Sequence, residues 1–394
     1  MKSRIFHTDK YEEIESRKSF SPLALTEGRI ARGYNKAQLA TAIGVTRQAI
    51  SLIEKGGYEP KPETLSKISD ILELPQRYFF RNPIEDFSKE TPVFFRELSK
   101  TTDMLHERAN VKAKWHYNGY LELTKYLKQI EKNLPNFCFQ EGYDFTKLTE
   151  EDIENYAKEL RKFWGLNLSP IIGLSPLLEK NGILVFQIDV KADINGFSFY
   201  ANGSIPFIFC VKNVPAGRNR FNLAHELGHI LLHAIADKNE LNKHHKLFED
   251  QANYFAGAFL FPKERFFDEF FSTDLNYLIN LKQRWGMSMG AIIKRALNLE
   301  MLDDNDVGNF YKRNPGIRKK EPLDEEIEVE QPTFPHNGLR ALLDAGLTTV
   351  DDLKTELPYN NEDLAEMFCV EKSLFETNDE NKVIANIIEF KRKD

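Results

Sequence analysis

The stretch FNLAHELGHILLH, residues 221–233, contains three histidines at intervals of four residues. Because an α-helix completes a turn in about 3.6 residues, His225 and His229 would lie one turn apart on the same helical face. Two imidazoles in that arrangement can bind one Zn²⁺ ion at about 2.0–2.1 Å. Glu226 would lie near the edge of this face, where its carboxylate can reach a water molecule on the metal. The spacing therefore predicts an HExxH helix that supplies two metal ligands and a general base.

The alternative interpretation is a helix that carries histidines for structural reasons. In a chain with nine histidines, an HExxH pattern arises by chance in roughly one case in a hundred. The surroundings favour the metal site, because apolar residues 230–232 would bury one helical face and leave the other to line a cleft. Gly228 costs about 1 kcal/mol in a helix relative to alanine, which indicates that another segment passes close to it.

A catalytic zinc site needs a third protein ligand and an open position for water. His233 lies two turns beyond His225, about 12 Å along a straight helix, so we expect it to pack against or orient a neighbour. His244 and His245 lie in a polar stretch that we expect to be a solvated loop. None of these three histidines is therefore the preferred third ligand.

The preferred third ligand is Glu249. It begins a predicted helix whose apolar face would pack against the HExxH helix. Asp250 is the alternative, although its side chain points about 100° away. Together with the two histidines, Glu249 would complete a His₂Glu site.

The region around the HExxH helix mixes helical and strand patterns. Residues 150–166 have the pattern of an amphipathic helix, and three β-rich runs follow at 183–189, 196–203 and 205–213. The tetrapeptide ANGS is a candidate hairpin turn between the last two runs. The last run could be an edge strand that pairs with an extended substrate, or an ordinary buried strand. The pattern predicts an α+β domain.

Six stretches of this region resemble the ImmA/IrrE family of metallopeptidases and occur in the order expected for it. The resemblance covers about residues 150–300 and is far more specific than HExxH alone. The six stretches are ENYAKELRKFWGL, LLEKNGILVF, INGFSFYANG, GRNRFNLAHELGHILLH, EDQANYFAGAFLFP and WGMSMGAIIKRALNL.

The resemblance implies a zinc ion held by His225, His229 and Glu249, with Glu226 as the general base. It also implies a protease core followed by a small part similar to a helix-turn-helix. Members of the family typically cut a repressor and so release genes in phage, mobile-element or stress regulation. The family often has a second acid where this chain has Gln251, but we expect an intact site because Glu249 is present.

A second motif lies near the N-terminus, in residues 35–72. Helices are predicted at 36–43 and about 46–54, with a turn at Gly44 and an N-cap at Thr46. This pattern resembles the XRE, or lambda-repressor-like, helix-turn-helix family. Such a domain places its second helix in the major groove of DNA.

By position in this motif, Arg47, Gln48 and Ser51 would face base edges, and Lys36 and Thr46 would hold phosphate groups. The family commonly has glutamine at the position of Lys36. Residues 1–80 contain thirteen Lys and Arg against ten Asp and Glu, a local charge of only +3 in a chain of net charge −7. The alternative is a module that binds protein or forms dimers without binding DNA.

The chain of 394 residues is long enough for two or three domains at roughly 150 residues each. We expect a multidomain protein with an all-α helix-turn-helix domain, an α+β zincin-like metallopeptidase domain and a small helical C-terminal module. The predicted segments are a DNA-binding domain at 1–80, a helical connector at 81–147, the peptidase domain at 148–317, an acidic linker at 318–333 and the C-terminal module at 334–394.

Other classes of protein fit the sequence poorly. No apolar run approaches the roughly 20 residues of a membrane helix, and the first residues lack the apolar region of a signal peptide. The three cysteines lie far apart, as expected in a reducing cytoplasm. The expected partners are operator DNA, a protein substrate that is a repressor, and a second copy of the chain on a palindromic site.

The sequence allows two functions. One is a zinc endopeptidase that is fused to a DNA-binding domain and acts on a transcriptional repressor. The other is a DNA-binding regulator in which the peptidase fold is a sensor or scaffold without proteolytic activity. A peptidase that had lost its activity should lack at least one of the three ligands or the general base, and this chain has all four residues.

Overall fold

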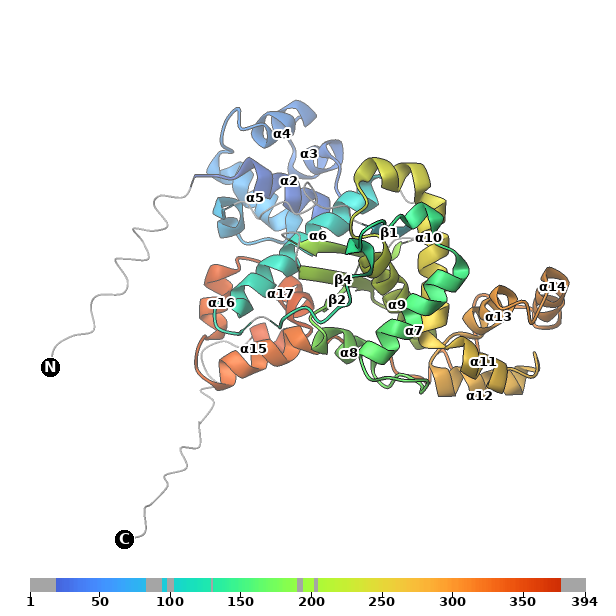
Figure 1. Cartoon of the computed structure of the whole chain (residues 1–394). Helices are drawn as coiled ribbons and strands as arrows, with labels where there is room; N and C mark the ends of the chain where they lie inside the picture. The colour runs from blue at the N-terminus through green and yellow to red at the C-terminus, as the bar shows by residue number, and fades with distance from the viewer. Residues whose placement is uncertain are drawn as a thin grey trace, which may run out of the picture.

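The computed structural model describes residues 19–82, 94–97, 103–128, 130–189, 194–201 and 205–376, and Figure 1 gives the arrangement. A mixed sheet lies at the centre of the described part. One face of the sheet packs against α6 (Asp103–Thr124) and the other against α9 (Ala216–Leu232). The helix-turn-helix and the C-terminal helices lie on the α6 side, and the remaining helices lie on the α9 side.

The N-terminal helices have the arrangement expected for a helix-turn-helix. Asn35 and Gln38 form a capping box at the start of α3, and Gly44 ends this helix with a left-handed backbone (φ 75°). Thr46 accepts a hydrogen bond from the backbone N–H of Ala49, so the second predicted helix begins one residue later than 46. The helices are α2 (Pro22–Ala31), α3 (Lys36–Ile43), α4 (Arg47–Glu54), α5 (Pro62–Leu72) and the 3₁₀ helix η1 (Gln76–Phe80).

The sheet has the strand order β1-β3-β4-β2. Strand β4 pairs antiparallel with β3 and parallel with β2. The idea that residues 205–213 form an edge strand is therefore wrong, because β4 has a neighbour on each side. Ala201 pairs with Ile205, while residues 202–204 of the expected hairpin turn lie outside the described residues. The strands are β1 (Phe94–Glu97), β2 (Leu184–Ile188), β3 (Ile194–Ala201) and β4 (Ile205–Val211).

Part of the segment 81–147 lies in the core rather than between domains. Its strand β1 pairs antiparallel with β3, and its helix α6 (Asp103–Thr124) packs on the opposite face of the sheet from α9. Trp115 and Tyr117 of α6 are both 1% exposed, and the Tyr117 ring contacts the Phe207 ring of β4. The expected connector was based on helical periodicity alone, which does not show that a helix is buried on several sides. Two 3₁₀ helices, η3 (Phe137–Phe139) and η4 (Phe145–Lys147), follow α6.

Helix α9 covers the other face of the sheet, and α10 lies on the outer side of α9. Helix α10 packs along α9, and a Cβ atom added at Gly228 would lie 3.2 Å from the Cα atom of Ala252, so the glycine permits this close approach. The expectation that His244 and His245 lie in a loop is wrong. Asp237 and Glu240 form a capping box that starts α10 before both histidines, and a kink lies at His244. The helices are α7 (Glu150–Phe163), α8 (Leu174–Lys180), α9 (Ala216–Leu232) and α10 (Lys238–Leu260).

The acidic segment 318–333 packs against the peptidase region instead of forming a solvated spacer. Glu321 is 4% exposed, forms an ion pair with Lys282 and accepts hydrogen bonds from the first backbone N–H groups of α13. Glu330 forms an ion pair with Arg220 of α9. The acidic composition suggested a spacer. Composition alone does not show which acidic residues have buried partners, so the prediction was wrong. The neighbouring helices are α11 (Lys263–Glu269), α12 (Leu275–Trp285), α13 (Met289–Asn298) and α14 (Asp304–Arg313).

The C-terminal helices share a core with α6 and with the helix-turn-helix. The Trp115 ring of α6 contacts Tyr78, near the end of the helix-turn-helix, and Tyr359, with ring centroids 5.7 and 5.0 Å away, and the two tyrosine rings also contact each other. Arg32 of the N-terminal part also forms an ion pair with Asp363 at 2.5 Å. The elements are α15 (Phe334–Asp344), α16 (Val350–Glu356), α17 (Asn361–Phe368) and η5 (Lys372–Phe375). None of the helices in the described residues combines the length and the apolar composition that a membrane span needs.

Candidate metal centre

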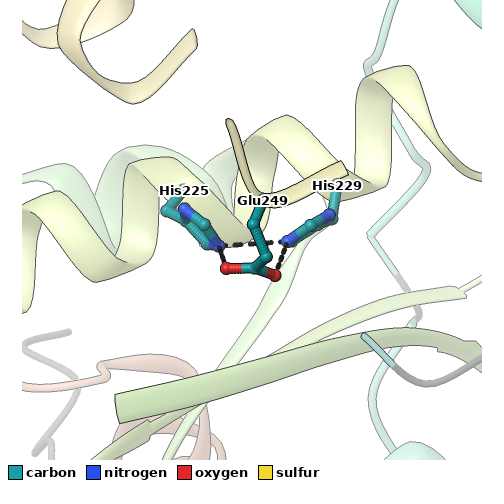
Figure 2. Close-up of side chains that lie close together, drawn as sticks. All are labelled: His225, His229 and Glu249. Carbon is teal, nitrogen blue, oxygen red and sulfur yellow. Dashed lines mark hydrogen bonds and ion pairs between the residues drawn. The ribbon is translucent and has the colours of Figure 1, made fainter. Parts of the chain in front are cut away.

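Helices α9 and α10 bring together the three residues expected to bind a metal ion. His225 and His229 project from one face of α9, and Glu249 projects toward them from α10 (Figure 2). The two histidine Nε2 atoms lie 3.0 Å apart. One carboxylate oxygen of Glu249 lies 3.4 Å from His225 Nε2, and the other lies 3.3 Å from His229 Nε2. Both imidazoles are buried, at 0% and 1% exposed.

These distances fit three ligands of one small cation. Ligands that bind a tetrahedral zinc ion at 2.0–2.1 Å lie about 3.3 Å from one another. The three candidate ligand atoms all lie within 4.8 Å of one another. A His₂Glu donor set is also typical of catalytic zinc sites. The residues present therefore fit a zinc ion.

Two other candidate ligands are placed elsewhere. Asp250 pairs with Lys246 at 2.5 Å, and its side chain is 60% exposed. His233 lies one turn beyond His229, and its Nδ1 atom lies 3.0 Å from His229 Nδ1, on the side of that ring away from Glu249. The expectation that His233 orients a neighbour agrees with this contact.

Each metal-facing imidazole has a partner at its other nitrogen. His225 Nδ1 lies 3.0 Å from Asn253 Oδ1, which can only accept, so His225 donates from Nδ1. In the neutral form of the ring, which a metal ion requires, the lone pair is then on Nε2, the atom that lies beside Glu249. Sequence reasoning did not identify Asn253. The available signal was its spacing, because Asn253 lies four residues after Glu249 and thus on the same face of α10.

The ionisation of the acidic and histidine groups suits cation binding. Burial raises the pKa of Glu249, but the hydrogen bonds and charges of His225 and His229 outweigh burial and hold the pKa below its ordinary value. Glu249 is therefore a carboxylate. Burial lowers the pKa of His233 far below its ordinary value, helped by the neighbouring His229, so His233 is neutral.

The predicted general base, Glu226, lies between α9 and the sheet. Its side chain is fully buried, and the Ser198 hydroxyl of β3 donates to its Oε2 atom at 2.7 Å. A Cβ atom at Gly196 of β3 would lie 3.3 Å from Glu226 Oε1 and 3.0 Å from the Phe209 carbonyl oxygen. Ser198 and Gly196 were not predicted as site residues. Strand alternation places them on one face, but only the tertiary structure shows that this face meets Glu226.

A cleft of about 940 Å³ extends from this region between α9, α10 and α13. It is lined by residues that continue the two helix faces bearing the candidate ligands, Asn222 on α9 and Asn253 on α10. Arg218 and Lys294 contribute positive charge to the walls. The cleft provides room for a peptide beside the candidate ligands.

The residues expected to contact DNA lie on and around α4. Arg47 and Gln48 are exposed, while Ser51, one turn further along, is half-buried. The Thr46 hydroxyl caps α4 by accepting a hydrogen bond from the Ala49 N–H, and its own O–H group can still donate to a phosphate group. Lys36 has a partner that the sequence did not predict, because its Nζ atom lies 3.0 Å from Glu54, which also binds Arg29. Lys36 therefore links α3 to the end of α4.

The comparisons with known proteins agree with both motifs. Residues 25–79 match the family model described as Helix-turn-helix, and residues 178–297 match the IrrE N-terminal-like domain. The two matches occur in the order expected from the sequence, so the predicted resemblance is confirmed. The comparison with curated proteins finds no match.

Proposed function

We propose that this protein, which carries a helix-turn-helix domain ahead of an IrrE N-terminal-like domain, is a zinc-dependent endopeptidase that also binds DNA. One observation carries the peptidase part of the proposal. His225, His229 and Glu249 converge on one point from two helices, and Glu226 is the next residue after the first of them. The alternative, a regulator without proteolytic activity, does not require a complete donor set beside a buried carboxylate.

Each residue has a separate part in the proposed reaction. His225, His229 and Glu249 would hold the zinc ion, which when bound polarises a peptide carbonyl and makes water more acidic. The Glu226 carboxylate accepts the proton of the attacking water and returns it to the leaving amine. Ser198 holds this carboxylate in place by donating to Oε2. Asn253 keeps the His225 ring oriented with Nε2 toward the ion.

We propose a transcriptional repressor as the substrate. The support is the resemblance to the ImmA/IrrE family, whose members typically cut repressors, together with a helix-turn-helix in the same chain. Cleavage would release genes in phage, mobile-element or stress regulation, and would take place in the cytoplasm, where the DNA is. The exposed Arg47 and Gln48 would contact base edges of an operator, with two chains on a palindromic site.

The experiment compares new protein N-termini by mass spectrometry in cells that produce the wild type, Glu226→Gln or Glu159→Gln. Glu159 is exposed on α7 and serves as the control for loss of one acidic group. We expect Glu226→Gln to keep its zinc and lose cleavage of a DNA-binding protein, because glutamine cannot accept the proton. Equal cleavage by wild type and Glu226→Gln would contradict the proposed mechanism. Absence of cleavage by the wild type, with zinc and DNA bound, would favour the regulator.

A further inference from the structure

Two neighbouring cavities meet at a group of basic side chains. The cleft of about 940 Å³ beside the candidate metal centre and a second cavity of about 340 Å³ share Arg218, Ser288 and Lys294 in their walls. Arg318 also lines the second cavity. Arg218 belongs to α9, Lys294 to α13, and Arg318 to the segment after α14. We call Arg218, Lys294 and Arg318 the basic wall.

The basic wall carries positive charge that the described residues do not neutralise. The Arg218 guanidinium donates to the carbonyl oxygen of Arg318 at 3.0 Å, and the Arg318 guanidinium lies 3.9 Å from the centre of the Tyr311 ring. Both of these partners are uncharged. Lys294 is exposed and Arg218 is half-buried. Within the part of the chain that the structure describes, none of the three cations forms an ion pair with a carboxylate.

Most acids near the basic wall already have partners. Glu321, the acid in the second cavity, pairs with the buried Lys282 and accepts from the first backbone N–H groups of α13. In the cleft, Asp250 pairs with Lys246 at 2.5 Å. Glu150, at the start of α7, is the other acid that the described residues contribute to the cleft. Positive charge therefore predominates where the two cavities meet, although the net charge of the chain is −7.

The basic wall begins on the same side of α9 as the candidate metal ligands. Arg218 precedes His225 by seven residues, which is nearly two helical turns, so both project from one side of α9 about 10 Å apart along its axis. Asn222, between them, also lines the cleft. An extended peptide advances about 3.3 Å per residue. A peptide whose scissile bond lies at the candidate ligands therefore brings the third residue from that bond beside the basic wall.

We propose that the basic wall binds an acidic side chain of the protein substrate, about three residues from the scissile bond. Arg218 and Lys294 are then specificity-determining residues, because arginine and lysine form charge-assisted hydrogen bonds with a carboxylate and repel a positively charged segment. A peptide fits this wall better than DNA does, since the cleft leads to the candidate ligands and the residues expected to contact DNA lie on and around α4. The inference rests on the proposed function and names its substrate class.

The test is the binding of two fluorescein-labelled octapeptides to the full-length chain, measured by fluorescence anisotropy. Alanine alternates with glutamate in one peptide and with glutamine in the other, so a carboxylate can reach the basic wall in any register. The variants are Lys294→Gln and the double variant Arg218→Gln with Lys294→Gln. Lys243→Gln is the matched control, since Lys243 is an exposed cation of α10 outside the cleft walls. All chains also carry Glu226→Gln, so that the peptides stay intact.

With an intact basic wall and in Lys243→Gln, we expect the glutamate peptide to bind about 10-fold more tightly than the glutamine peptide. Lys294→Gln should reduce this preference, and the double variant should abolish it. Charge reversal by Arg218→Glu with Lys294→Glu should favour an otherwise identical lysine peptide, which loss of packing alone would not do.

Equal affinity of the intact wall for both peptides would overturn the inference, and so would an equal loss of preference in Lys243→Gln and in the double variant. A double variant that kept its preference for the glutamate peptide but lost affinity for duplex DNA would identify the wall as a DNA surface instead. None of these results depends on cleavage, so failure of the proposed function is distinguishable from failure of the basic wall.

Discussion

Arg47 is the first residue of α4, and its exposed side chain lies where a recognition helix begins to meet base edges. We expect Arg47→Ala to weaken binding to the preferred DNA sequence by about 1–3 kcal/mol, because arginine pairs bidentately with guanine. Binding to unrelated DNA should weaken less, since that binding depends on total charge. The measurement selects a preferred sequence from a random DNA library and compares its affinity with that of a shuffled duplex.

Lys67→Ala is the control for Arg47, because Lys67 is an exposed cation on α5. Removing this charge should weaken binding to the preferred duplex and to the shuffled duplex by the same factor. If Arg47→Ala also weakened binding to both duplexes by the same factor, this result would contradict base recognition by Arg47.

At the level of single residues, the sequence predicted the residues in contact with the candidate metal position and missed those behind them. Helical periodicity identifies His225 and His229 because four residues make about one turn, which is a local property. Glu249 was identified from the face of a predicted helix. Asn253 and Gln251 act on histidines of a different helix, and sequence spacing does not reveal which helices pack together. The same limit applies to Ser198, which reaches Glu226 from the sheet.

At the level of helices and strands, elements with local signals were predicted well. The helices of the helix-turn-helix begin and end at side-chain caps and at Gly44, which act within a few residues of the chain. The three runs at 183–189, 196–203 and 205–213 correspond to β2, β3 and β4. Their lateral order could not be predicted, because pairing of strands depends on contacts between distant residues.

Two elements were misjudged because burial is not a local property. Helix α6 has an ordinary charged composition, yet it is covered by the helix-turn-helix, the sheet and the C-terminal helices. Residues 318–333 are strongly acidic, yet Glu321 of that segment lies in an ion pair with the buried Lys282. In both cases a buried lysine is neutralised by a carboxylate from a distant segment, Lys112 of α6 by Glu366 and Lys282 by Glu321.

At the level of the whole molecule, the helix-turn-helix is attached through a shared core. Arg32, next to α2, donates to both carboxylate oxygens of Asp363 in α17 and to the Leu72 carbonyl oxygen. Asp363 is 5% exposed and also lies 3.5 Å from Lys112 of α6. These contacts connect the N-terminal part, the central helix and the C-terminal part of the chain.

We expect Arg32→Met to lower the free energy of unfolding by about 3 kcal/mol, because it leaves a buried carboxylate without its closest cation. Urea unfolding followed by circular dichroism measures the change. Lys372→Met is the control, since its ion pair with Glu376 is about half exposed and should contribute less than about 1 kcal/mol. Equal stability of Arg32→Met and the wild type would show that Arg32 does not couple these parts.

The most direct test of the central claim is the metal content of the purified chain by elemental analysis, beside Glu249→Ala and Asp250→Ala. The two variants remove neighbouring carboxylates of α10, of which only Glu249 faces the histidines. The account predicts about one zinc ion per chain in the wild type and in Asp250→Ala, and a large loss in Glu249→Ala. No zinc in the wild type after addition of the metal, or equal retention in both variants, would contradict a His₂Glu site formed by His225, His229 and Glu249.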